Sequence, residues 1–361
     1  MHEQSASEVL HTIFKRAYEE NASDIHIDPT EHHIKIQMRV DGILITQDPL
    51  PKFLHEQLIL LIKIRARLRT DEHLTSQDGR LRISISTSLY IEARVSLLPT
   101  FYGENAVIRL LKETFAAQSL SSLGLSKIDE GKISRALKKR HGMILVTGPT
   151  GSGKTTTLYT ILKQLNNSTQ AIITLEDPVE YTLPGIRQIP VSPHLHFNNG
   201  LRALVRQDPD IIMVGEIRDS DTAHVAVHTA LTGHLLLSTI HTSNSVTALP
   251  RLLDMGVDPY LVASTLEIVI AQRLVRKLCT YCKNNTGCEQ CNFTCYKERI
   301  GIYEVLVITD ALRAAIMNRT SSAELQKIAE REAMTPMHDN GSTLVAEGIT
   351  THEELARVLY E

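Results

Sequence analysis

The chain has 361 residues, of which 42% are hydrophobic and 22% are charged, and its formal net charge at pH 7 is −3. These values predict a globular protein of two or three domains, and a net charge so close to zero argues against a surface that binds nucleic acid directly. No apolar run approaches the roughly 18 residues of a transmembrane helix. The first residues also lack the basic and then apolar order of a signal peptide. We therefore expect a cytoplasmic protein.

The first 112 residues combine helical and strand patterns. Apolar residues recur on one helical face over 7–20 and again over about 52–68. Between these helices, alternating apolar and polar residues predict a strand over 34–40. Asp41 and Gly42 then predict a hairpin turn into the next strand.

Residues 78–111 return to strand patterns. The triplet 78–80 predicts a turn, and strands are expected at 81–86, 90–97 and 106–111. Residues 1–112 are therefore predicted to form a small α+β domain. The serine-rich stretch that follows is predicted to be part of a linker over 113–125.

From residue 126 strand patterns alternate with helical ones, which predicts an α/β core over 126–278 with a largely parallel sheet wrapped by helices. The expected strands lie at 143–147, 171–175, 211–214 and 234–239. The expected helices lie at 154–166, 219–231 and 244–254. A cysteine-rich element at 279–295 precedes a predicted helical subdomain over 296–361. Its expected helices lie at 310–317, 322–333 and 352–359.

One stretch of the core indicates phosphate chemistry. A short apolar run ends in the pattern Gly148-x-x-x-x-Gly153-Lys154-Thr155. A strand, a glycine-rich loop and a helix in this order are typical of a P-loop, whose backbone N–H groups surround phosphate oxygens. Lys154 can reach the β- and γ-phosphates, and the Thr155 hydroxyl can ligate Mg²⁺. The predicted ATP-binding residues are Gly148, Pro149, Thr150, Gly151, Ser152, Gly153, Lys154, Thr155 and Thr156.

Acidic residues and a histidine follow three of the expected strands. Glu176 and Glu180 come after the second strand, Glu216 ends a Walker B run after the third, and His241 follows the fourth. Ligands bind at this edge of an open α/β sheet. A carboxylate there can hold Mg²⁺ through water or orient an attacking water, and a histidine can sense the γ-phosphate. The alternatives are solvated loop acids or helix caps and a hydrogen-bonded structural histidine.

Four sequence boxes in a fixed order carry a resemblance to a known family. They lie at 148–159, 176–180, 206–219 and 232–242, and further matching segments lie at 23–27, 77–80 and 94–104. The chain resembles the ATPases of type II secretion and type IV pilus systems, in which these are the Walker A, aspartate, Walker B and histidine boxes. The resemblance implies a RecA-like P-loop ATPase domain behind a PAS-like N-terminal domain. It also implies a homo-hexameric ring that acts on an integral membrane platform protein.

The resemblance further implies roles for individual residues. Arg80, Arg94 and Arg109 match arginines of the first domain that close over the phosphates, whereas the sequence alone describes them as surface arginines. The planar donor group of arginine suits the charge of a phosphoryl group in transfer. Glu216 and Glu176 would position Mg²⁺ and the attacking water, with Glu216 near the ion.

The cysteines predict a metal site. They are Cys279, Cys282, Cys288, Cys291 and Cys295. The first four form two Cys-x-x-Cys pairs, which favours a tetrahedral Zn²⁺ site over free thiols in a cytosolic chain; the fifth is interpreted as a spare thiol. Within the resembled family this element marks assembly and secretion motors and is absent from retraction motors. Relatives usually carry a longer insertion between the pairs than the five residues found here.

These features together predict a motor. The leading domain that docks many relatives to membrane partners is expected to be missing, and short forms that keep the cysteines resemble the competence pseudopilus ATPases of Gram-positive bacteria. We therefore expect a hexameric ATPase at the inner face of the cell membrane that powers assembly of a pilus-like pseudopilus for DNA uptake. The alternatives are a type II secretion ATPase, a pilus retraction or DNA-secretion motor, and a small-molecule P-loop kinase. A nucleotide-binding scaffold without turnover is disfavoured by intact Lys154, Glu176 and Glu216.

Overall fold

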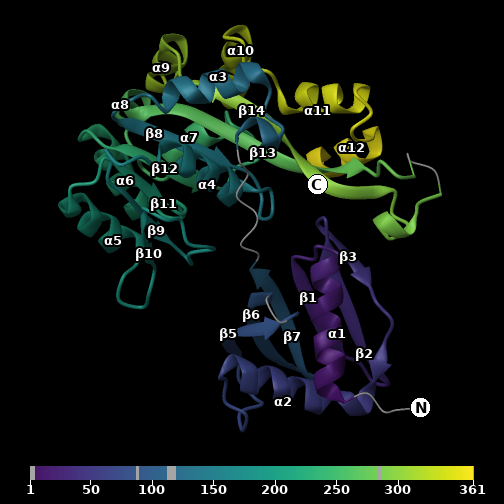
Figure 1. The fold of residues 1–361 in the computed structure, drawn as a ribbon. Helices are drawn as coiled ribbons and strands as arrows, with labels where there is room; N and C mark the ends of the chain where they lie inside the picture. The colour runs from purple at the N-terminus through teal and green to yellow at the C-terminus, as the bar shows by residue number, and fades with distance from the viewer. Residues whose placement is uncertain (1–4, 87–88, 112–118, 283–285, 361) are drawn as a thin grey trace. The chain divides into compact units, whose positions relative to one another are not determined.

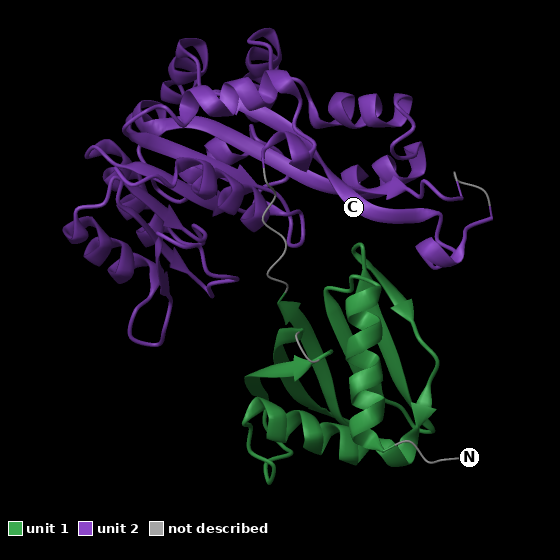
Figure 2. Ribbon diagram, viewed as in Figure 1, with its two compact units in different colours: residues 1–114 green, residues 115–361 purple. Residues whose placement is uncertain are grey.

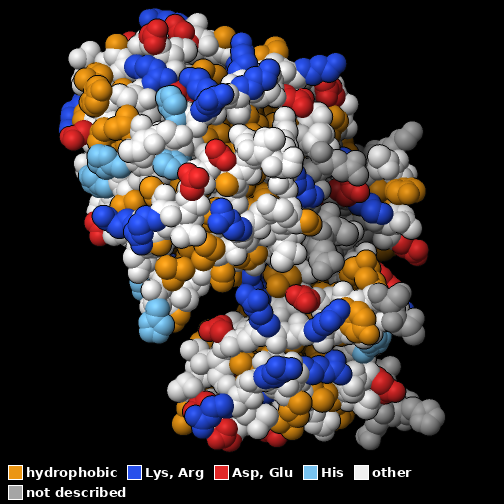
Figure 3. Space-filling view, turned by 60° about the vertical axis from the view of Figure 1, so that its left-hand side comes forward, with side chains coloured by type: hydrophobic (Ala, Val, Ile, Leu, Met, Phe, Trp, Pro, Cys, Tyr) orange, Lys and Arg blue, Asp and Glu red, His pale blue; other side chains and the backbone are white. Residues whose placement is uncertain are grey.

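The computed structural model describes residues 5–86, 89–111, 119–282 and 286–360. The chain divides into two compact units, Met1–Thr114 and Phe115–Glu361 (Figure 2). Among the described residues, no helix has both the length and the apolar character needed to cross a bilayer. On the face seen in Figure 3, Lys and Arg side chains are interspersed with acidic and hydrophobic ones in both units.

Unit 1 is an antiparallel sheet with helices on one face (Figure 1). The strand order is β3-β2-β1-β7-β6-β5, and β4 pairs with β2. The strands are β1 (Asp24–Pro29), β2 (His33–Val40), β3 (Ile43–Thr46), β4 (Leu50–Pro51), β5 (Gln77–Ser84), β6 (Tyr90–Thr100) and β7 (Gly103–Leu111), and the helices are α1 (Ala6–Glu19) and α2 (His55–Ala66). Alternate strand residues are buried with both helices in one core, as the period of two along a strand requires. The opposite face of the sheet carries mostly polar side chains.

Two glycines of unit 1 lead to opposite outcomes for the sequence prediction. Asp41 and Gly42 both have positive φ, 49° and 89°, as a tight hairpin turn requires, so the predicted turn is confirmed. The turn predicted at 78–80 is wrong, because these residues lie within β5. Position 79 requires glycine because of close packing and not because of a turn. A Cβ on Gly79 would lie 2.8 Å from Leu68 Cδ2 and 3.0 Å from the Ala66 carbonyl oxygen.

Unit 2 is a mostly parallel sheet with helices on both faces, as predicted (Figure 1). Its strand order is β10-β9-β11-β12-β8-β13-β14, and only the last pair is antiparallel. The strands are β8 (Gly142–Thr147), β9 (Ile172–Glu176), β10 (Arg187–Pro190), β11 (Ile211–Val214), β12 (Leu235–Ile240), β13 (Leu266–Leu278) and β14 (Tyr296–Val307). The helices are α3 (Lys127–Ala136), α4 (Lys154–Leu165), α5 (Phe197–Leu204), α6 (Ser220–Leu231), α7 (Ala248–Asp254), α8 (Pro259–Thr265), α9 (Asp310–Met317), α10 (Ser322–Arg331), α11 (Met337–Ala346) and α12 (His352–Tyr360).

The long hairpin of β13 and β14 corrects the predicted boundary of the helical subdomain. Residues 296–307 form β14, which pairs with β13 along most of its length, so the helical part of the chain begins only at α9. The local sequence of β14 does not show which strand it will pair with. That partner, β13, also pairs with β8 on its other side.

The predicted linker over 113–125 is wrong at its end. Leu120 and Leu125 are only 1% and 6% exposed and pack in the core beneath β8 and α4 of unit 2. Burying two leucines fixes this segment to the core of unit 2, because each contributes about 2 kcal/mol of transfer free energy. The part of the predicted linker over 113–118 lies outside the described residues.

An ion triad attaches the last helix to the long hairpin. Glu354 of α12 is 1% exposed and accepts hydrogen bonds from Arg276 Nη2 at 2.7 Å, Arg276 N at 3.0 Å and Arg357 Nη2 at 2.7 Å. Burial alone would raise the pKa of Glu354, but the hydrogen bonds from Arg357 and Arg276 outweigh it and hold this pKa at about 2. The carboxylate is therefore ionised in the folded protein over the whole neutral range.

Replacing Glu354 by glutamine is expected to lower the free energy of unfolding by about 3 kcal/mol, because two arginines lose the charge that compensates them. Since the folded pKa lies below its ordinary value of 4.5, the contribution of Glu354 to wild-type stability is complete above pH 4.5 and is lost as the pH falls toward about 2. Urea unfolding at pH 7 and pH 3 measures both effects. The exposed neighbour Glu353→Gln is the control, with a change within about 0.5 kcal/mol. Equal stability of both variants would contradict the account.

Candidate functional site

The carboxyl ends of four parallel strands bring the predicted site residues of unit 2 to one edge of its sheet. β8, β9, β11 and β12 run parallel, with Leu145, Leu175, Val214 and Ser238 at matching positions in the ladder. The P-loop follows β8, Glu176 ends β9, Glu216 follows β11 and His241 follows β12. This edge is where open α/β sheets bind ligands.

Glycine is required at two points of the P-loop. Gly148 and Gly153 have φ values of 147° and 89°, which side chains with a Cβ rarely adopt. A Cβ on Gly148 would lie 2.5 Å from the Gln272 carbonyl oxygen, and one on Gly153 would lie 2.9 Å from Gln272 Nε2. The loop is thus folded tightly against β13 before α4 begins at Lys154. The N-terminus of α4 therefore follows the loop directly, and the free N–H groups of a helix N-terminus attract phosphate.

Lys154 and Thr155 lie at the first turn of α4. Lys154 Nζ donates to the carbonyl oxygens of Gly148 at 2.8 Å and Pro149 at 2.9 Å. Burial lowers the pKa of Lys154 to about 8; the charge of Glu216 opposes this shift and that of Arg273 adds to it. Thr155 is exposed at the N-terminus of the helix. An anion that enters the loop would therefore stabilise the charged form of Lys154.

Glu216 and His241 are brought together by neighbouring strands. Glu216 Oε2 lies 3.4 Å from His241 Nε2, and its Oε1 accepts a hydrogen bond from Arg218 Nη2 at 2.5 Å. The Glu216 side chain is 15% exposed and that of His241 is 48% exposed, so both remain accessible. The chain after β12 is held to β8 because Thr242 N donates to Thr147 Oγ1 at 2.9 Å. A carboxylate so placed can hold a hydrated Mg²⁺ or orient water.

Glu176 differs from Glu216 in being enclosed. It is 3% exposed and accepts hydrogen bonds from Tyr159 Oη, from Thr174 Oγ1 at 2.5 Å and from Gln188 Nε2 at 3.2 Å. Burial and the hydrogen bond to Glu176 raise the pKa of Tyr159. The N–H of Glu180 lies 3.3 Å from the same tyrosine oxygen. These contacts link β9 to α4, the helix that begins at the P-loop.

Gln272 and Arg273 are site residues that the sequence did not reveal. Gln272 Oε1 accepts from Thr157 Oγ1 at 2.7 Å and its Nε2 donates to the Ser152 carbonyl, so this 1% exposed side chain holds the P-loop from β13. Arg273 Nη2 donates to the Ser243 carbonyl at 2.8 Å and contributes positive charge near Lys154. The available signal is the apolar, β-branched run 268–271, which the two polar residues follow directly.

Arg80, Arg94 and Arg109 form a row in unit 1. Arg80 pairs with Arg94 across β5 and β6, and Arg94 pairs with Arg109 across β6 and β7. The row continues through Asp24 of β1, whose Oδ1 accepts from Arg109 Nε at 3.0 Å, to Arg39 of β2. Four arginines and one carboxylate thus share one line on the face opposite the helices. We call these five residues the arginine row; its excess of positive charge suits an anion.

Four cysteines meet in the turn between β13 and β14. The Sγ–Sγ distances are 3.8 Å for Cys279 and Cys288, 3.8 Å for Cys282 and Cys291, and 3.7 Å for Cys288 and Cys291. All four sulfur atoms lie within 4.8 Å of one another. A tetrahedron with Zn–S bonds of about 2.3 Å has S–S edges of about 3.8 Å. The donor set therefore fits one zinc ion despite the short spacing between the two pairs.

The fold and the site define a class of protein. A P-loop at the carboxyl edge of a parallel sheet, with a lysine, a threonine and an accessible glutamate around it, is the site of a P-loop nucleoside triphosphatase. The chain belongs to a particular family of them: the model of the family described as "Type II/IV secretion system protein" matches residues 2–357. It is an ATP-hydrolysing enzyme of that family, whose members use ATP with Mg²⁺.

Curated relatives from three organisms agree with this family. The chain is 45% identical over 359 residues to the type II secretion system protein HxcR of Pseudomonas aeruginosa, covering 97% of this chain and 76% of the relative. It is 41% identical over 380 residues to the type II secretion system ATPase E of Vibrio cholerae, with coverage of 98% and 75%. It is 39% identical over 386 residues to the type IV pilus assembly ATPase PilB of Thermus thermophilus, covering 99% of this chain but 43% of PilB.

Solved structures share the fold. The pilus retraction motor PilT with bound ADP matches with a TM-score of 0.71 at 26% identity, covering 97% of this chain and 96% of PilT. The ATPase DotB of Legionella pneumophila matches with a TM-score of 0.79 at 22% identity, covering 100% and 97%. The predicted RecA-like P-loop architecture with an α+β N-terminal domain is confirmed.

Proposed function

We propose that this chain is a motor that converts ATP hydrolysis into assembly of a pilus-like filament and thereby supports DNA uptake. Membership of the secretion and pilus ATPase family supports the motor, as do relatives named for type II secretion and pilus assembly. The observation that carries the proposal is that Lys154 and Glu216 lie near each other at the carboxyl edge of the parallel sheet. A triphosphate and its metal ion can be held together there.

The residues of this edge divide the work of hydrolysis. Lys154 would bind the β- and γ-phosphates with the N–H groups of the P-loop, and the Thr155 hydroxyl would be a ligand of Mg²⁺, which would neutralise phosphate charge. Glu216 would help to hold this ion or orient the attacking water, with His241 beside it. Glu176 and Glu180 both contact Tyr159, and these contacts would keep β9 and α4 at a fixed spacing during hydrolysis.

The arginine row supplies the remaining charge in this proposal. Arg80, Arg94 and Arg109 neutralise charge on the phosphates in the transition state, for which arginine is well suited. A homo-hexamer is the proposed assembly, with a membrane platform protein as the partner at the cytoplasmic face of the membrane. Rotation of units driven by nucleotide would then move the partner.

A second filament function has its own support. The type II secretion relatives are 41–45% identical to this chain, which favours a pseudopilus that exports protein. Deletion of the gene separates the two functions. Loss of transformation with normal protein export supports DNA uptake, and loss of export with normal transformation supports secretion.

Turnover by the purified chain tests the motor against the kinase alternative. A motor hydrolyses ATP to ADP and phosphate without any acceptor molecule and assembles into a multimer, which mass measurement detects. A stable monomer that transfers phosphate to a small acceptor, with no hydrolysis in its absence, would overturn the proposal. The four clustered cysteines favour an assembly or secretion motor over a retraction motor.

Zinc is expected in the purified protein at one ion per chain. Elemental analysis should find it, and Cys288→Ser should release it and lower the melting temperature, because a tetrahedral site with three thiolates closes the turn less tightly. Cys295 lies outside the cluster, so Cys295→Ser is the matched control and should keep both the metal and the melting temperature. Absence of zinc from protein purified without chelators would contradict the assignment.

A further inference from the structure

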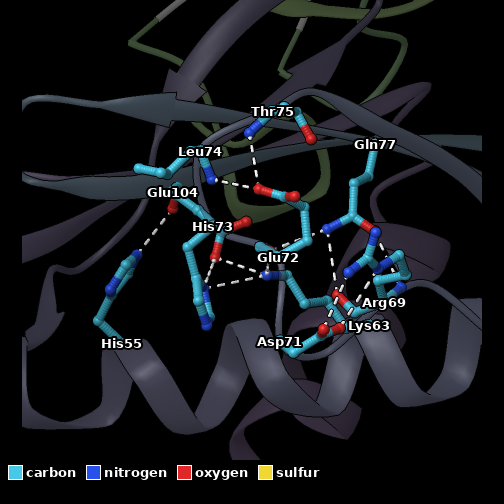
Figure 4. Close-up of polar contacts among 10 residues, drawn as sticks. All are labelled: His55, Lys63, Arg69, Asp71, Glu72, His73, Leu74, Thr75, Gln77 and Glu104. Atoms are coloured by element: carbon cyan, nitrogen blue, oxygen red, sulfur yellow. Dashed lines mark hydrogen bonds and ion pairs between the residues drawn. The ribbon is translucent and has the colours of Figure 1, made fainter.

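Unit 1 buries an ion pair beneath its sheet (Figure 4). Lys63 of α2 is 0% exposed and Glu104 of β7 is 7% exposed, and Lys63 Nζ donates to Glu104 Oε2 at 2.7 Å. Removing two charges from water costs several kcal/mol per ion, and a pair of apolar residues of similar size is often as stable or more stable. Stability alone therefore does not account for an ion pair at this position.

The same ammonium also binds the loop that leads into β5. Lys63 Nζ donates to the Glu72 carbonyl oxygen at 2.6 Å. That oxygen accepts a second hydrogen bond, at 3.1 Å, from Nε2 of Gln77, the first residue of β5. Gln77 in turn bonds the backbone of Arg69, accepting from its N–H at 2.9 Å and donating to its carbonyl at 3.1 Å. Figure 4 shows these side chains converging above α2.

These contacts form one continuous connection, from Glu104 through Lys63 and the Glu72 carbonyl to Gln77. We call Lys63, Glu104 and Gln77 the clamp. It joins β7 to β5, which are not neighbours in the sheet, because β6 lies between them. His73 Nδ1 lies 2.7 Å from Glu104 Oε2 and covers the outer side of the pair.

The clamp residues of β5 and β7 lie on the face of the sheet opposite Arg80 and Arg109. Gln77 and Gly79 face α2, so Arg80 points to the other face of β5. Glu104 is buried on the helix side of β7, and Arg109 is exposed on the opposite side. The two outer strands of the Arg80–Arg94–Arg109 segment are therefore the two strands that the clamp connects.

Arg80 lies on an edge strand, so its position depends more on contacts such as the clamp than the position of Arg94 or Arg109 does. Among the described residues, β5 is the last strand of the sheet and pairs with β6 alone, so one ladder fixes its position. An edge strand held on one side shifts more easily than a central one. Groups that stabilise a transition state must be held to within about 0.5 Å of their working positions.

We propose that Lys63, Glu104 and Gln77 are positioning residues, which act through β5 and β7 to set the spacing of Arg80 and Arg109 for phosphoryl chemistry. This rests on the proposed role of the arginine row in ATP hydrolysis. The clamp touches no phosphate; it fixes the strands from which the arginines project.

The test is a double-mutant cycle on the full-length chain, read as steady-state ATP turnover. Lys63→Met with Glu104→Leu replaces the ion pair by apolar residues, which preserves the core but removes the bond to the Glu72 carbonyl. We expect kcat to fall about tenfold to a hundredfold with the KM for ATP within about threefold, the pattern of a contact made in the transition state. In an Arg80→Ala background the same pair should cause almost no further loss.

Two further variants keep the test decisive. Gln77→Ala removes the clamp at an accessible position and should show the same non-additive loss, so it decides the matter if the paired variant fails to fold. Asp71→Asn, in the same loop but bonded to Arg69 outside the clamp, is the control and should leave turnover unchanged. Wild-type turnover in the folded clamp variants, or losses that add fully to that of Arg80→Ala, would overturn the proposal. Normal turnover in Arg80→Ala alone would instead remove the role of the arginine row, and the clamp proposal with it.

Discussion

Glu216→Gln is expected to lower ATP turnover by about 100-fold or more while leaving ATP binding within a few-fold of wild type. Glutamine keeps the size and the hydrogen-bonding reach of glutamate but loses the charge that holds Mg²⁺ or orients the attacking water. We expect a large effect because the Glu216 side chain is mostly shielded from water, at 15% exposure, which strengthens its charge interactions. It still reaches the surface beside His241, where a ligand can enter. Phosphate release and binding of a fluorescent ATP analogue measure the two quantities separately.

The same variant has a second, smaller consequence. The charge of Glu216 holds the pKa of Lys154 up, against the lowering caused by burial. Removing that charge should therefore lower this pKa further and weaken ATP binding more at pH 8.5 than at pH 7. Asp221→Asn, an exposed acid in the first turn of α6, is the control and should change neither turnover nor binding. Full turnover in Glu216→Gln would exclude Glu216 from the reaction.

Lys154→Ala is expected to abolish turnover and to weaken ATP binding by about 100-fold, because the loop loses the cation that spans the β- and γ-phosphates. The pH dependence gives an independent check. The lysine binds phosphate as a cation, and its pKa in the free protein is about 8. The charge is thus complete well below pH 8 and is lost as the pH rises through it. The KM for ATP of the wild type should therefore rise above pH 8.

Lys163→Ala is the matched control for this experiment. Lys163 is exposed in the last turn of the same helix, α4, and its loss should leave both turnover and the pH profile unchanged. A KM that stays flat between pH 7 and pH 9.5 in the wild type would contradict a lysine that loses its charge near pH 8 in the free protein. Binding of ATP to Lys154→Ala at wild-type affinity would contradict the assignment of the P-loop.

The sequence predicted those parts of the site that depend on local backbone geometry. The P-loop could be found because Gly148, Gly153 and Lys154 must lie in a fixed order to surround a phosphate. The Asp41 and Gly42 turn could be found for the same reason. Gly79 shows the limit of this reasoning: its glycine serves close packing against Ala66 and Leu68, and the local sequence does not distinguish that use from a turn.

The parts that were missed depend on contacts distant in sequence. Gln272 donates to the carbonyl of Ser152, which lies 120 residues earlier in the chain. The two meet because β13 pairs with β8, the strand that leads into the P-loop. The alignment of Arg80, Arg94 and Arg109 depends on the register of three strands, which the residues themselves do not specify. The cysteine pairs were evident from spacing, but their position at the end of a long hairpin was not.

The length of β13 has a mechanical consequence. One strand holds the P-loop through Gln272 and, immediately after its last residue, enters the cysteine turn at Cys279. At about 3.3 Å per residue, roughly 20 Å of extended backbone separate these points. Pairing with β14 stiffens that length, so the two strands form a lever arm. A tilt of a few degrees where the phosphate loop rests on the strand displaces the cysteine turn by about 1 Å, far from the nucleotide.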